Sequence, residues 1–180
     1  MGETNLSSTI EMNISETLTA MMFYTKESLV WGEILHHESV LPSRILVGVT
    51  VPEFISVFNA KMIFLEPNFI SNPVSHSEIH IPAKKIIGYH LMPPHEDQID
   101  YDPSEPNRKM QPMTVFLGPF TVKGSIRISG LTTVKSNLEV TKSEFMALYD
   151  LQINHTHQRE MKPIHAKMGY FRVRENIFAV

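Results

Sequence analysis

The chain contains no cysteine, so it can form neither a disulfide framework nor a metal site built on thiolates. A chain without disulfides suits a reducing compartment. No apolar run approaches the roughly 20 residues of a membrane helix, and residues 1–20 lack the basic and apolar regions of a signal peptide. We therefore expect a cytoplasmic protein that does not enter a membrane.

Short motifs typical of enzyme sites are also missing. The sequence has no phosphate-binding glycine loop, no nucleophile elbow and no His-Glu-x-x-His zinc motif. Asp97, Asp100 and Asp102 alternate as in a calcium loop, but the glycine and the closing glutamate of such a loop are absent. We expect a solvated acidic segment here, and a protein that is not an enzyme and has no cofactor.

Nine histidines are the remaining candidates for metal ligands. His155 and His157 would share one face of a strand and could bind a metal together. Adjacent His36 and His37 would point to opposite faces, and no carboxylate stands at a suitable spacing. We predict no metal site and keep metal binding through histidines as an alternative.

A short stretch occurs twice and organises the chain. Residues 49–59 and 140–150 lie 91 positions apart and share four identical residues, in the pattern Val-Thr-x-x-Glu-Phe. A Gly-x-Ile sequence precedes each copy, at Gly32 and at Gly124. Anchors in the same order indicate a duplicated unit.

The repeat divides the chain into two units joined by a linker. We predict a flexible tail over residues 1–20, a first barrel over 21–91, a proline-rich acidic linker over 92–113 and a second barrel over 114–180. Units of this size bury a limited fraction of their surface, so we expect each unit to pack against the other unit or against another subunit.

Within each unit, short segments of alternating polar and apolar residues are bounded by turn residues, as is typical of strands. Segments 44–49 and 134–140 occupy matching places, and we predict a strand in each. Asn59 and Asp150 close the repeated stretch, where each would be the pivot between two strands. The pattern predicts an all-β protein made of two five- to six-stranded barrels.

Each unit resembles the Sm-like small β-barrel, in which a long strand with Gly-x-Ile enters a hairpin and an Asn or Asp pivots between central strands. The chain also resembles a group of bacterial proteins of unknown function with a Phe-Ile-x-Leu-x-Asp-Ala core, matched at residues 54–60 and 145–151. The resemblance implies tandem Sm-like or SH3-like barrels. The Asp and Asn residues with which Sm proteins hold RNA bases are not matched in this sequence.

The two halves of the chain differ in charge. Residues 1–113 carry 14 acidic and 7 basic side chains, a net −7, whereas residues 114–180 carry 5 acidic and 9 basic, a net +4. The halves could attract each other within one chain or between chains. Four basic residues of the second half are the candidates for contact with an anion or a nucleic acid: Lys123, Arg127, Arg172 and Arg174.

Binding of single-stranded nucleic acid also needs aromatic rings beside the basic side chains. Phe120, Tyr170 and Phe171 lie near them in the sequence. In the competing interpretation, Lys123 and Arg127 are simply the solvent face of a half-buried strand. Nucleic acid is therefore a possible partner but not the favoured one.

Alternation along residues 121–129 places Val122, Ile126 and Ile128 inward. Transferred to the first unit, it puts four apolar side chains on the outer face: Leu29, Trp31, Leu35 and Leu46. Such a patch, with the only tryptophan, usually marks an interface. The N-terminal segment, the second barrel or another molecule would cover it.

The sequence favours a non-enzymatic protein-interaction or scaffold module. Small barrels must pair or cover their exposed strand edges, so we expect self-association, with a homo-oligomer or another protein as the partner. A module that binds RNA or single-stranded nucleic acid is the first alternative, and a metal-binding protein is the second.

Overall fold

The computed structural model describes residues 13–180 except 49, 67–68, 71, 97–98 and 157–161. The expected all-β class is confirmed, since strands dominate and one short α-helix accompanies two 3₁₀ turns. The elements are β1 (Glu16–Tyr24), β2 (Ser28–His37), η1 (Pro42–Arg44), β3 (Phe54–Glu66), β4 (Phe69–Ile70), β5 (Val74–Pro82), η2 (Ala83–Lys85), β6 (Gly88–Leu91), β7 (Arg108–Leu117), β8 (Phe120–Ser129), α1 (Val134–Val140), β9 (Phe145–His155), β10 (Ile164–Arg172) and β11 (Ile177–Ala179). No helix in these ranges is long and apolar enough to span a membrane.

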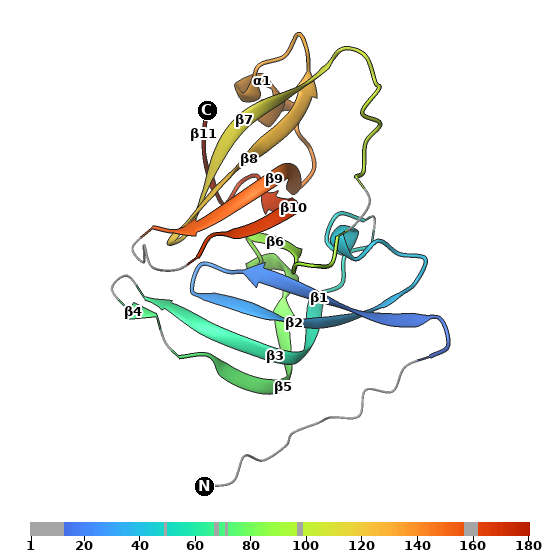
Figure 1. Ribbon diagram of the computed structural model, residues 1–180, viewed down its shortest axis with the longest axis vertical. Coiled ribbons are helices and arrows are strands. Elements are labelled where there is room, and N and C mark those ends of the chain that lie inside the picture. The colour runs from blue at the N-terminus through green and yellow to red at the C-terminus, as the bar shows by residue number, and fades with distance from the viewer. Residues whose placement is uncertain (1–12, 49, 67–68, 71, 97–98, 157–161) are drawn as a thin grey trace, which may run out of the picture.

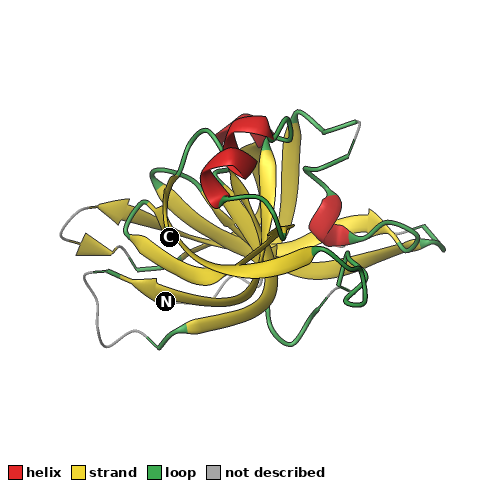
Figure 2. Ribbon diagram, turned by 90° about the horizontal axis from the view of Figure 1, so that it is seen from above, coloured by secondary structure: helices red, strands yellow, loops and turns green. Residues whose placement is uncertain are grey.

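The strands form one antiparallel sheet that does not close on itself. Its order is β11-β7-β8-β9-β10-β6-β1-β2-β3, and both β4 and β5 pair with β3. The first half, β1 to β6, lies below the second half, β7 to β11, in Figure 1, and β6 meets β10 between them. Figure 2 shows that the strands curl strongly, with the helical segments at the margin of the sheet.

Two apolar clusters lie on the two faces of this sheet. One contains the inward residues of the first half, such as Val30 and Val57, and reaches Phe145 of the second half. The other contains the inward residues of the second half and reaches Tyr24 and Leu29 of the first. The central strands are therefore covered on both faces, which explains why all four residues of β6 are buried.

A glycine lets each half bend at the same place. The register of β2 with β3 shifts around Gly32, and that of β8 with β9 shifts around Gly124. A Cβ at these positions would lie 2.5 Å from a carbonyl oxygen of β3 and 2.9 Å from one of β9, so only glycine fits. Asn59 and Asp150, with φ of 47° and 54°, bend the facing strands. The expected break into two strands at each pivot is wrong, because β3 and β9 continue through the bend.

The predicted strand over residues 44–49 is also wrong. The 3₁₀ turn η1 and a second turn occupy residues 42–47, and position 49 lies outside the described residues. Pro42 has no amide hydrogen to give to a sheet and starts the turn instead. The amide of Val47 then donates to the carbonyl of Arg44 at 3.0 Å.

The predicted strand over residues 134–140 is the helix α1. Thr133 is its N-cap, and the Thr133 hydroxyl accepts a hydrogen bond from the amide of Ser136 at 3.2 Å. Val134 is buried and Leu138, one turn later, packs against the same cluster. The segment therefore forms a helix because its apolar residues have helical spacing, although its β-branched residues favour a strand.

Two strands extend beyond the predicted boundaries of the units. β1 begins at Glu16, inside the predicted tail 1–20, and β7 begins at Arg108, inside the predicted linker 92–113. Pro112 fits in β7 because β11 pairs only with residues 114–116 and needs no amide from position 112.

Candidate interaction site

The two halves meet at a short antiparallel pairing of β10 with β6, called the joint below. Three residue pairs form it: Gly169 with His90, Tyr170 with Tyr89, and Phe171 with Gly88. A Cβ at Gly169 would lie 3.1 Å from the Cβ of His90, and one at Gly88 would lie 2.9 Å from the ring of Phe171. A small residue on one strand thus faces a large one on the other, which lets the strands approach closely.

Aromatic rings fill one side of the joint. Tyr89 stacks on Tyr170 with ring centroids 5.4 Å apart, and Phe145 meets Tyr89 edge-on at 5.4 Å. The three side chains are almost fully buried, and burial raises the pKa of Tyr89 above its usual value. The Tyr89 hydroxyl donates to the carbonyl of Ser43 at 2.9 Å. Each aromatic pair contributes about 0.5–1.5 kcal/mol beyond the area it buries.

Arg172 closes the end of the joint. Its Nε donates to the carbonyl of Ile86 and its Nη2 to that of Ala83, both at 2.9 Å. Its Nη1 donates to the carboxylate of Glu144 at 2.5 Å, and the guanidinium lies 4.6 Å from the ring centroid of Phe145. The side chain is only 13% exposed, so Arg172 holds the two halves together and is not open to an external anion.

Asp100 attaches the linker to both halves. It accepts hydrogen bonds from the hydroxyls of Tyr149 at 2.6 Å and Tyr170 at 3.1 Å, and Nη2 of Arg44 lies 3.6 Å from Oδ2. Burial, followed by the Asp100 charge, raises the pKa of Tyr170 to about 12. Asp100 is thus a partly buried contact between the linker and the two halves, where we expected a solvated acidic segment.

Arg127, the second basic candidate, is also used inside the chain. It donates to the carboxylate of Glu105 at 2.7 Å and to the carbonyl of Asp102 at 3.0 Å, and its guanidinium lies 4.6 Å from the ring centroid of Tyr101. Only two of the four basic candidates remain exposed, Lys123 and Arg174.

The aromatic residues expected to stack on nucleic-acid bases are Phe120, Tyr170 and Phe171. All three are buried, with exposed fractions of 3% or less. Rings enclosed in a core present no face to a base, so the structure does not place open aromatic and basic side chains together.

The predicted interface patch does not form one surface. Leu29 is buried in the cluster of the second half, and Trp31 packs against the same cluster, half-buried. Leu46 belongs to the opposite cluster with Val30, so its outward assignment is wrong, because residues 45–47 form a turn and do not alternate. Leu35 remains half-buried on β2.

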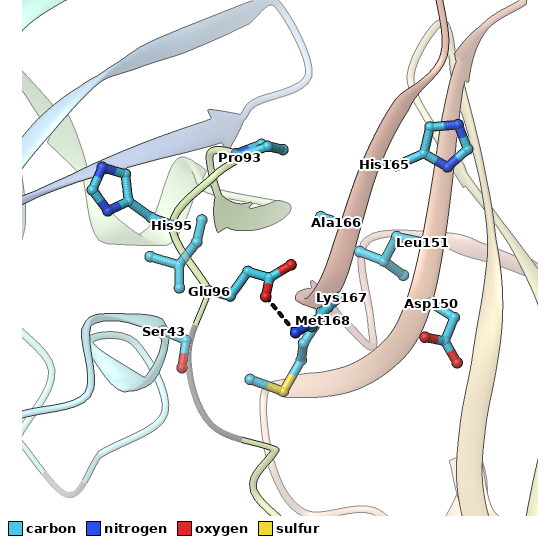
Figure 3. A pocket seen from close by; sticks show the side chains of 11 residues that line it. Ser43, Pro93, His95, Glu96, Asp150, Leu151, His165, Ala166, Lys167 and Met168 are labelled. Carbon is cyan, nitrogen blue, oxygen red and sulfur yellow. Dashed lines mark ion pairs between the residues drawn. The ribbon is translucent and has the colours of Figure 1, made fainter.

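A half-open cavity of about 320 Å³ lies between the start of the linker and strands β9 and β10 (Figure 3). Glu96 and Lys167 form an ion pair across it, and His95 and His165 stand on opposite sides. In the described part of the chain, no three residues of the types His, Cys, Asp and Glu are placed to hold a metal. His157 lies outside the described residues.

The outer edges of β5 and β11 are called the free edges below, because no other described strand pairs with them. Large side chains are open beside them. Phe54, next to β5, is 51% exposed, the His80 side chain is 59% exposed, and Ile177 on β11 is 71% exposed. Sequence reasoning missed these residues, although the repeat aligns Phe54 with the buried Phe145.

The joint and the free edges offer backbone hydrogen bonds and apolar contacts, which are the interactions of strand pairing. Comparison of the chain with protein-family models, with curated proteins and with solved structures found no match.

Proposed function

We propose that this chain is a cytoplasmic, non-enzymatic interaction or scaffold module that associates with further copies of itself through its free edges. The observation that carries the proposal is the open sheet, which ends at β11 on one side and, beyond β3, at β4 and β5 on the other. A row of unpaired backbone groups at a sheet edge is a template for pairing with another chain. Exposed Phe54 and Ile177 supply apolar area beside these edges.

The proposal includes two tandem small barrels of the Sm-like or SH3-like type, related by a repeat of about 91 residues. It is supported by the strand order, which is β6-β1-β2-β3-β5 in the first half and β11-β7-β8-β9-β10 in the second. The bends agree as well, with Gly32 and Asn59 in one half and Gly124 and Asp150 in the other. Each half thus contains the same order of five strands, with one edge at the first strand in this order and another at the last; β4 is an additional strand of the first half.

Sedimentation velocity of the full chain over a wide concentration range tests the proposed self-association. The average sedimentation coefficient should rise with concentration, because edge pairing follows mass action. A single monomeric boundary at every concentration would overturn the proposal.

A further inference from the structure

The two free edges have the geometry of the two sides of the joint. We propose that β5 of one copy pairs with β11 of a second copy, in the register and with the ring packing that β10 and β6 already show. This inference rests on the proposed self-association and names the surfaces and the register that it uses.

Register within the sheet gives the equivalent positions on β5. His80 lies opposite Ser56 just as Tyr170 lies opposite Ala147, and Ser56 and Ala147 are 91 positions apart in the repeat. Position 80 on the free edge therefore corresponds to Tyr170 in the joint. Phe54 corresponds to Phe145 by the same repeat.

Register also gives the equivalent position on β11. Phe178 lies opposite Val115 on β7, as Tyr89 lies opposite Phe23 on β1. Phe23 stands two residues after Met21, which faces Gly32. Val115 likewise stands two residues after Met113, which faces Gly124. Position 178 therefore corresponds to Tyr89, the ring at the centre of the joint.

The free edges thus carry the planar side chains that the joint uses. Phe54 and His80 on one side, with Phe178 on the other, stand where Phe145, Tyr170 and Tyr89 pack together. Phe145 is 4% exposed under its neighbours, whereas Phe54 is 51% exposed. The difference is explained by the partner strand, which is present at β10 and absent at β5.

Side-chain sizes preserve the small-to-large pattern of the joint in one of the two flanking pairs. The joint places Gly169 opposite His90 and Phe171 opposite Gly88. The equivalent pairs between copies are Ile79 with Ala179 and Ile81 with Ile177. Ala179 is the small member of the first pair, and Ile177, 71% exposed on β11, would enter the rim of the first-half cluster that contains Ile81.

Charge favours this head-to-tail arrangement over a symmetric one. β5 belongs to the half before the linker, residues 1–91, which carries 9 acidic and 5 basic side chains, a net −4. β11 belongs to the half after the linker, residues 108–180, which carries 5 acidic and 11 basic side chains, a net +6. Pairing β5 with β11 sets unlike charges against each other, whereas two β5 edges would bring like charges together. A head-to-tail contact leaves a free edge at each end, so it continues into a ring or a chain of copies.

The contact between copies lacks two supports of the joint. Pro82 stands opposite Phe54, where the joint has Arg172 opposite Phe145, so no guanidinium binds the neighbouring turn. The covalent linker that raises the local concentration of β10 near β6 is also missing between copies. The association is therefore expected to depend on concentration.

Two edge variants test the inference. Phe54→Ser removes a ring beside β5, and Ile177→Lys places a charge on β11; both side chains are exposed, so the fold should remain. Each variant should raise the dissociation constant of self-association about tenfold or more. Phe64→Ser and Leu131→Lys are matched controls at exposed positions away from the free edges, and both should associate as the parent chain does.

Mixing the two variants sharpens the test. Phe54→Ser keeps an intact β11 edge and Ile177→Lys keeps an intact β5 edge, so the mixture should form one-to-one dimers but nothing larger. Dimers of Ile177→Lys alone, or edge variants that associate like their controls, would refute the head-to-tail pairing and leave self-association standing. A parent chain that stays monomeric would refute both.

Discussion

The joint and the free edges show equivalent strands with and without a partner. At the joint, Phe145 and Tyr170 enclose Tyr89, and Arg172 closes the end. At the free edges Phe54 and His80 are exposed, and Phe178 is only partly buried against the cluster of its own half. The difference teaches that these rings become fully buried only where a neighbouring strand is present.

The largest expected effect comes from removing the central ring of the joint. Tyr89→Ala should lower the free energy of unfolding by about 3–5 kcal/mol, because it empties a fully buried aromatic site. Phe178→Ala, at the equivalent position on β11, should cost clearly less in the monomer, since Phe178 is only partly buried. Urea denaturation at low protein concentration measures both, and equal losses would contradict the comparison.

The next largest effect is a dependence of stability on pH that comes from His90. Burial lowers the pKa of His90 to about 4, and the neutral ring donates from Nδ1 to the carbonyl of Leu91 at 2.7 Å and accepts from the Tyr24 hydroxyl at 3.1 Å. The unfolded chain, with a histidine pKa near 6.5, binds the proton first. Stability from this group is therefore complete above about pH 6.5 and is lost as the pH falls toward 4, by on the order of 3 kcal/mol.

His90→Gln should reduce the dependence of the free energy of unfolding on pH. Urea denaturation between pH 7 and pH 4 measures this dependence, because the range begins just above the ordinary histidine pKa of about 6.5. His76→Gln, at an exposed position nearer the start of β5, is the matched control and should leave the profile unchanged. Profiles that change equally in both variants would show that burial at the joint is not the cause.

The two bend glycines test whether the halves are built alike. Gly32→Ala and Gly124→Ala should each destabilise the chain by about 1–3 kcal/mol, because the added Cβ meets a carbonyl oxygen. Gly48→Ala is the control, since a Cβ there has no atom within 4 Å. If either variant had the same midpoint of thermal unfolding as Gly48→Ala, the two halves would not share this bend.

Loss of the guanidinium at the end of the joint has the smallest expected effect. Arg172→Met removes the side-chain donor of the carbonyls of Ala83 and Ile86, of which Ala83 keeps the amide of Ile86, and should cost about 1–2 kcal/mol. Arg174→Met, at an exposed position two residues later, should change stability by no more than about 0.5 kcal/mol. Similar losses in both variants would show that Arg172 does not hold the halves together.

Local pattern predicted the strands and their bends better than the helical segments. Alternation placed Val122, Ile126 and Ile128 inward, and all three are buried. The β-branched residues of segment 134–140 favoured a strand, although the Thr133 cap and the four-residue spacing of Val134 and Leu138 favour the helix that forms. A search for caps would have corrected that prediction.

The joint could not be predicted from local sequence. Its strands are about 80 positions apart, and neither carries a signal for the other. The sequence suggested that Arg127 and Arg172 are available for an external anion. Their acceptors, Glu105 and the carbonyl of Ala83, become neighbours only after folding. Only the repeat contained the information that relates Phe54 to Phe145.

A disulfide between two copies tests the proposed register most directly. In the joint, Tyr170 and Tyr89 face each other as an antiparallel pair, so residues 80 and 178 of two copies would have Cα atoms about 4.5–5.5 Å apart, within disulfide reach. The chain has no cysteine of its own. A mixture of His80→Cys and Phe178→Cys chains should therefore cross-link into heterodimers under mild oxidation. His76→Cys, about 13 Å along β5, should not cross-link with Phe178→Cys. Equal yields from positions 76 and 80, or homodimers alone, would contradict the pairing of β5 with β11.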